Sequence, residues 1–142
     1  MDEKPKSIST KKGQVYINKH GILIQTYHEN TDLTLEDAKA DFESYSDLCK
    51  DCKLPVLIEM ENVRSVERET RAYYSSEEAK NYITAAALLI TNPVNRIIGN
   101  FYMGLNKTAF PFRLFTEKKK TIQWLKKHLS AKQKNGTKGS TN

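Results

Sequence analysis

The sequence predicts an α/β domain with a mixed, largely parallel sheet of 4–5 strands, flanked by helices. Two short apolar segments, Pro55–Met60 and Ala85–Ile90, have the length of buried strands rather than helices. Segments with helical periodicity lie between and after them, and this alternation implies parallel pairing through right-handed crossovers. We therefore expect these two strands to lie side by side beneath amphipathic helices.

The chain is predicted to open with a β-hairpin followed by a long helix. Val15–Ile17 and Ile22–Ile24 flank a turn that Gly21 allows. Thr34, with Asp37 three residues later, is typical of a capping box and marks the start of the helix. The helix should run to about residue 52, and its apolar stripe comprises Leu35, Ala38, Phe42, Tyr45, Leu48 and Cys49.

The rest of the chain alternates in the same way. Residues 65–74 are expected to be helical, and a short turn or helix follows at 75–82. Asn92-Pro93 supplies an N-cap and a first-turn proline, so another helix should begin there. A last strand at 112–115 and a closing helix that carries Trp124 and Leu125 complete the predicted order.

The charge is unevenly distributed along the 142 residues, whose formal net charge is +6. Residues 117–142 hold eight Lys and one Glu, residues 1–12 have a net charge of +2, and residues 13–116 are left with −3. We expect disordered basic tails at 1–12 and 130–142 around one domain at 13–129. A folded basic face is not indicated, so no specific nucleic-acid partner is expected.

Cysteine usage and the absence of an export signal indicate a reducing, cytoplasmic setting. No apolar run is long enough to span a membrane. Cys49 and Cys52 match C-x-x-C, but they fall at the C-terminal end of the predicted helix, where the dipole does not favour a thiolate. We interpret them as two ordinary thiols. The three histidines lack ligand-like spacing, and neither a metal nor another cofactor is predicted.

No arrangement typical of a hydrolase, metalloprotease or phosphate loop occurs, so we predict that the protein is not an enzyme. Glu59 and Glu61 could pair as carboxylates, although a solvated strand end is the simpler interpretation.

The candidate binding residues follow the two central strands, because partners of open α/β sheets meet the loops beyond the carboxyl ends of strands. Three arginines after the first strand could face an anionic group. The alternative is an exposed helix start in which Glu67 pairs with Arg71. The full candidate set is Asn62, Arg64, Ser65, Arg68, Arg71, Asn92, Arg96 and Asn100.

Segments with a familiar pattern occur along the chain, and they are Thr34–Lys39, Pro55–Met60, Asn62–Val66, Asn92–Lys107, Pro111–Phe115 and Trp124-Leu125. In these segments, over about residues 14–129, the chain resembles the bacterial STAS-like proteins, also labelled STAS/SEC14 or SpoIIAA-like. The resemblance implies a mixed sheet packed by helices and a regulatory or binding role rather than catalysis. Relatives in the wider superfamily are switched by phosphorylation of a Ser in an Asp-Ser-Ser-Gly-like turn. Here the matching residues, Val66–Thr70, contain neither Ser nor Gly.

We therefore predict a non-catalytic, cytosolic regulatory or protein-interaction module with an unidentified protein partner. A homodimer is left open as an alternative. A small-molecule or lipid carrier, which the SEC14 label suggests, is a second hypothesis. Association of the basic tails with nucleic acid or an anionic membrane is a third.

Overall fold

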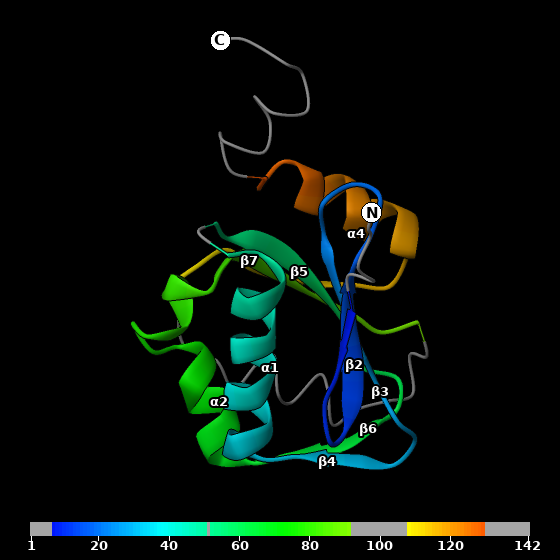
Figure 1. Ribbon diagram of the computed structural model, residues 1–142. Helices are drawn as coiled ribbons and strands as arrows, with labels where there is room; N and C mark the ends of the chain where they lie inside the picture. Colours follow the sequence, from blue (N-terminus) through cyan, green and yellow to red (C-terminus); the bar gives the residue numbers. More distant parts are fainter. Residues whose placement is uncertain (1–6, 51, 92–107, 130–142) are drawn as a thin grey trace, which may run out of the picture.

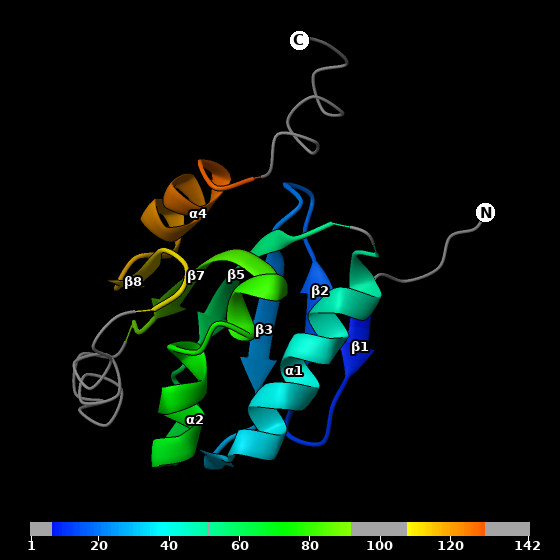
Figure 2. The ribbon, with the colours of Figure 1, turned by 90° about the vertical axis from the view of Figure 1, so that its left-hand side faces the viewer.

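The computed structural model describes residues 7–50, 52–91 and 108–129 (Figure 1). At its centre lies a six-stranded sheet with the order β1-β2-β3-β5-β7-β8. The strands are β1 Ser7–Ser9, β2 Gly13–Ile17, β3 Leu23–Tyr27, β5 Leu54–Glu59, β7 Ile83–Leu89 and β8 Phe112–Phe115. Figure 2 shows helices α1 (Leu35–Leu48) and α2 (Arg68–Tyr74) in front of the strands.

The pairing confirms the predicted class, a mixed and largely parallel sheet. β1, β2 and β3 pair antiparallel, whereas β3, β5, β7 and β8 run parallel. The two central strands lie side by side, with Leu57 opposite Ala87. Their residues 54–58 and 85–89 are buried, as is expected for strands covered on both faces.

The sheet has one strand more than the predicted 4–5, because the N-terminal segment joins it. Ser7–Ser9 form β1 and pair with β2, so the assignment of residues 7–12 to a disordered tail is wrong. This segment has only three residues, two of them serines, so its sequence shows no alternation of apolar and polar residues that would indicate a strand. Residues 1–6 and 130–142, the remainder of the two expected tails, lie outside the described residues.

A second, two-stranded parallel sheet pairs β4 (Thr31–Leu33) with β6 (Val63–Val66). Ser65 and Val66 belong to β6, so the expected helix at 65–74 is wrong at its start. The helix, α2, begins at Arg68. The buried Val63 and half-buried Val66 anchor β6 on the core, and the backbone N–H of Glu67 donates to Leu33 O. Pairing with a strand 30 residues away overrides the local helical pattern.

Helix α1 is held by the predicted capping box, in which Thr34 and Asp37 bond each other's backbone N–H. Ala38, Phe42 and Tyr45 of its stripe are buried. The helix ends at Leu48, four residues earlier than expected.

The cysteines end this helix as a disulfide between Cys49 and Cys52, so the interpretation as two ordinary thiols is wrong. Cys49 is the C-cap, and the backbone N–H of Cys52 donates to its carbonyl oxygen. This tight turn brings the two Cα atoms to 5.6 Å, within the usual range for a disulfide. The pairing removes the free thiols from which we inferred a reducing setting.

Two glycines shape the hairpin. Gly21 has a φ of 85° in the β2–β3 turn, as predicted, and the Asn18 side chain accepts from the N–H groups of His20 and Ile22. Gly13 lies so close to β3 that a Cβ there would meet the carbonyl oxygen of Thr26 at 2.0 Å. Only glycine fits at that position.

The two faces of the large sheet have separate cores. α1 and α2 cover the first, whose largest buried side chains include Phe42 and Tyr45. A 3-10 turn, η1 (Ala79–Asn81), and β7 close this side. Helix α4 (Lys118–Lys126) covers the second face and buries Leu125 against Leu57, Ala85 and Ala87. The helix predicted to begin at Asn92-Pro93 lies outside the described residues.

Candidate functional site

The parallel strands β3, β5, β7 and β8 end at one edge of the sheet, and the β4–β6 sheet extends from this edge. β4 follows β3 along the chain, and β6 follows β5. The predicted position of the site, beyond the carboxyl ends of the central strands, is therefore occupied by a small sheet of its own.

Arg64, Ser65 and Asp32 form a polar cluster on the outer side of the β4–β6 sheet. The Arg64 guanidinium contacts both carboxylate oxygens of Asp32, with Nε at 3.0 Å from Oδ1. The Ser65 hydroxyl donates to Oδ1 at 2.5 Å. The bonds from Arg64 first, and then from Ser65, lower the pKa of Asp32. Asp32 thus orients Arg64 and neutralises its charge.

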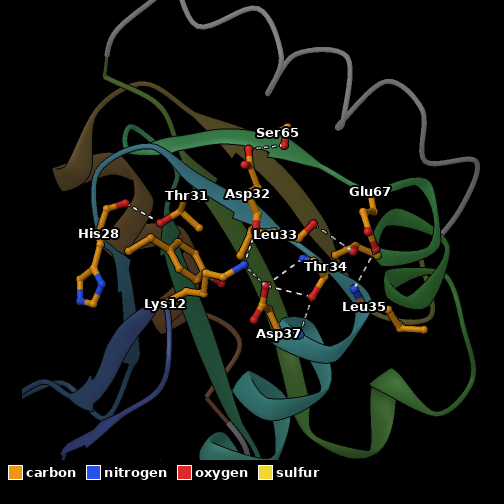
Figure 3. A network of polar contacts seen from close by, with 12 residues as sticks. Lys12, His28, Thr31, Asp32, Leu33, Thr34, Leu35, Asp37, Ser65 and Glu67 are labelled. Atoms are coloured by element: carbon orange, nitrogen blue, oxygen red, sulfur yellow. Dashed lines mark hydrogen bonds and ion pairs between the residues drawn. The ribbon is translucent and has the colours of Figure 1, made fainter.

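A second cluster joins β4 to the start of α1 (Figure 3). Lys12 Nζ donates to Asp37 Oδ2 at 2.7 Å and to the carbonyl oxygen of Asp32. Partial burial acts to raise the pKa of Asp37, but the bonds from Lys12 and Thr34 outweigh it, and the pKa is lowered. Lys12, which we placed in a disordered tail, is therefore part of the folded domain.

Asn62 and Glu67 also have internal partners. The Asn62 amide donates to the carbonyl oxygen of Tyr27 at 3.0 Å and ties the β5–β6 turn to the end of β3. A Glu67 carboxylate oxygen accepts from the backbone N–H of Leu35 at 3.4 Å (Figure 3). The alternative pairing of Glu67 with Arg71 does not occur between these two described residues.

Arg68 and Arg71 differ from the other candidates because neither side chain makes a hydrogen bond or ion pair within the described part of the chain. Arg68 is exposed and Arg71 is half-buried, both on α2. The structure thus brings Asn62, Arg64 and Ser65 together around β4 and leaves two arginines beside them. The candidates Asn92, Arg96 and Asn100 lie outside the described residues.

A small pocket lies at the same edge, between the ends of β5 and β7 and the start of α4. Its volume is about 150 Å³, and Glu59, Glu61, Leu89, Thr91 and Lys118 line it. Lys118 Nζ is 4.0 Å from a Glu59 carboxylate oxygen, so one carboxylate is already near a cation. Sequence reasoning considered the two glutamates but missed Lys118, because a helix 59 residues away brings it there.

The most unusual titratable group is buried and was missed from the sequence. Asp41 of α1 is 2% exposed, and the Tyr27 hydroxyl donates to its Oδ2 at 2.5 Å. Burial raises the pKa of Asp41 to about 7, and also raises that of Tyr27. A carboxylate on the apolar stripe, between Ala38 and Tyr45, was the available signal. Because both side chains are buried, this pair has a structural role in the core and is not placed to contact a substrate.

Among residues 7–50, 52–91 and 108–129, no group of three or more His, Cys, Asp or Glu side chains could hold a metal ion. No described helix is both long and apolar enough to cross a membrane.

The sequence matches the family described as "Domain of unknown function (DUF7793)" over residues 15–129, and the chain belongs to this family. No curated protein matches the chain.

Two solved structures are similar to it. One is an uncharacterized protein of the DUF3478 family from Shewanella loihica PV-4, described as having a SpoIIAA-like fold. It is 14% identical, with 88% of this chain and 98% of that chain covered and a TM-score of 0.47. The other, a protein of unknown function from Arthrobacter sp. FB24, is 23% identical, with 83% and 95% covered and a TM-score of 0.32. The first description names the fold that the sequence resemblance implied, while the fold class itself rests on the strand pairing described above.

Proposed function

We propose that this domain is a non-catalytic protein-interaction module of STAS type with a regulatory role. Its contact surface is the outer side of β6 and α2, which we call the arginine surface and define as Arg64, Arg68 and Arg71. The observation that carries the proposal is that the side chains of Arg68 and Arg71 make no hydrogen bond or ion pair within the described part of the chain, on the helix that follows the strand of Arg64.

The unneutralised guanidinium groups of Arg68 and Arg71 suit a protein partner with acidic side chains. The guanidinium of arginine is planar, permanently charged and weakly hydrated, and arginine is enriched at protein interfaces. Arg64 keeps a 62% exposed side chain although Asp32 holds it, so little side-chain entropy remains to be lost on binding.

A carrier for lipids or other apolar molecules has less support. Ligand pockets usually measure about 300–1,000 Å³. Among the described residues, the pocket beside Glu59 measures about 150 Å³, which is below that range. Native mass spectrometry of the purified chain is expected to show the mass of the protein alone. A co-purifying apolar ligand would contradict the module in favour of the carrier.

The direct test compares two charge-reversed baits. We expect Arg68→Glu with Arg71→Glu to reduce recovery of the partner from a native-host lysate at least about tenfold, or about 1.4 kcal/mol of binding. The matched control is Lys19→Glu with Lys50→Glu. Both lysines are exposed and precede the parallel strands β3 and β5, at the opposite edge of the sheet.

Arg64 is left unchanged in this test, because its loss would also free Asp32. Proteins that bind the wild type and the control but not the arginine variant are the expected partners. Identical recovery by all three baits would rule out the arginine surface.

A further inference from the structure

We propose that the outer side of α4 is a sequence-independent docking surface for the phosphate backbone of nucleic acid. It lies away from the arginine surface and does not depend on the proposed function. We call it the lysine face.

The lysine face follows from how α4 packs. Thr121 and Leu125 have no exposed surface and face the sheet, with Ile122 and Trp124 half-buried beside them. At about 100° per residue, the opposite side of the helix is centred on Gln123. The exposed residues of that side are Lys119, Lys120, Gln123, Lys126 and Lys127. Packing thus gathers the lysines into two pairs, one helix turn to either side of Gln123.

The charge of this face is poorly balanced. Lys120 lies 3.9 Å from Glu117, but both side chains are well exposed. The side chains of Lys119, Lys126 and Lys127 make no ion pair or hydrogen bond within the described part of the chain. No acidic residue follows Glu117, and residues 130–142 add three further lysines. Arg64, in contrast, is neutralised by Asp32. A concentration of one sign of charge on one helix side attracts a polyanion.

The packing favours nucleic acid over a membrane. The apolar side of α4 packs on the sheet, with Leu125 buried and Ile122 and Trp124 half-buried, so little apolar surface of the helix remains to enter a bilayer. Trp124 is occupied by ring contacts, at 5.5 Å from Phe115 and 4.5 Å from His128. Charge alone supplies about 1 kcal/mol per lysine near an anionic bilayer. Release of counterions from phosphates supports nucleic-acid binding without any apolar contact.

The composition of the face also predicts a lack of sequence preference. Lysine contacts phosphate as a point charge, whereas base recognition commonly uses arginine forks or amide side chains. Gln123 is the one amide among four lysines. Without a free aromatic ring on the face, stacking on unpaired bases is not expected either.

The test measures binding of the full chain to a labelled DNA duplex of about 20 base pairs, with a single-stranded RNA of similar length as a second probe. The lysine-face variant replaces Lys119, Lys120, Lys126 and Lys127 with Gln. The matched control replaces Lys11, Lys19, Lys39 and Lys50, which are exposed and lie elsewhere, and it loses the same charge.

We expect the wild type and the control to bind with a steep salt dependence, and the lysine-face variant to bind at least about tenfold more weakly. Each phosphate contact contributes about 0.9 to the slope of log K against log salt, so the slope should fall by about 2–4 in that variant. The double variant Lys119→Gln with Lys126→Gln should show about half of this fall in slope. A graded loss of this kind distinguishes lost phosphate contacts from a general folding defect of the fourfold variant.

Four results would overturn the proposal. They are an equal loss in the control, unchanged binding by the lysine-face variant, no binding of either nucleic acid by the wild type, and binding of phosphatidylserine vesicles in place of nucleic acid. Circular dichroism and Trp124 fluorescence establish that each variant retains α4.

Discussion

The two faces of the six-stranded sheet are packed by different kinds of side chain. On the α1–α2 face, Phe42 contacts the rings of four tyrosines at centroid distances of 5.2–5.6 Å. On the α4 face, α4 buries Leu125 against aliphatic residues, which are Ile22, Ile24, Leu57, Ala85, Ala87 and Leu89. Interlocking aromatic rings stabilise one face, while aliphatic side chains pack beneath a short helix on the other.

The polar interior differs as well. The α1–α2 face buries Asp41 against Tyr27, and the Tyr45 hydroxyl donates to Gln25. On the α4 face the buried polar side chain of the helix is Thr121, whose hydroxyl donates to the carbonyl oxygen of Glu117 in the turn before it. Stability and pH sensitivity are therefore properties of the first face. The second face presents charge to solvent.

The largest effect should come from removing the centre of the aromatic face. Phe42→Ala deletes a fully buried ring, and it should lower the free energy of unfolding by about 3–5 kcal/mol. Leu125→Ala, the corresponding change on the other face, should cost about 2–3 kcal/mol. Urea unfolding of both variants measures the difference, and equal losses would contradict the asymmetry.

A smaller, pH-dependent effect should come from Asp41. Its pKa is raised from 3.8 to about 7 in the folded state, so the unfolded chain releases this proton first as the pH rises. Stability is therefore greatest below pH 4 for this group, and it declines between about pH 4 and 7, by at most about 4 kcal/mol. Asp41→Asn should flatten that decline.

Asp47→Asn, at an exposed position on the same helix, serves as the control and should retain the wild-type profile. Urea unfolding across the pH range measures all three proteins. If the stability of Asp41→Asn still declined over this pH range, the decline would have to come from other titratable groups.

The smallest effect concerns the disulfide, which packs beside the aromatic face. Because Cys49 and Cys52 are three positions apart, the bond constrains a short loop. Its reduction should cost no more than about 2 kcal/mol. Thiol titration of the denatured, non-reduced chain should find no free thiol, and unfolding with and without a reductant gives the energy. Two titratable thiols would contradict the pairing.

Sequence patterns predicted the elements whose signals are local. The capping box at Thr34, the turn at Gly21 and the two central strands are all present, because neighbouring residues encode each of them. β1 and β6 were missed, since both depend on pairing with strands elsewhere in the chain.

The sequence predicted where the candidate site lies but not which charges are neutralised there. Arg64 and Ser65 do lie beyond a central strand, yet Asp32, on β4, determines their charge balance and orientation. Asp32 carries no motif, so its role could not be recognised before the β4–β6 pairing was known. The lysines near residue 120 were visible as a charge run, but not their collection on one side of a packed helix.

The sequence by itself determined the α/β class, the parallel centre of the sheet and the start of α1. Each is encoded by periodicity or capping within a few residues. Only the tertiary structure decided which charges are neutralised, which carboxylate is buried and which lysines share a face. Electrostatic energies depend on distance and burial, and the chain sets both only when remote segments pack together.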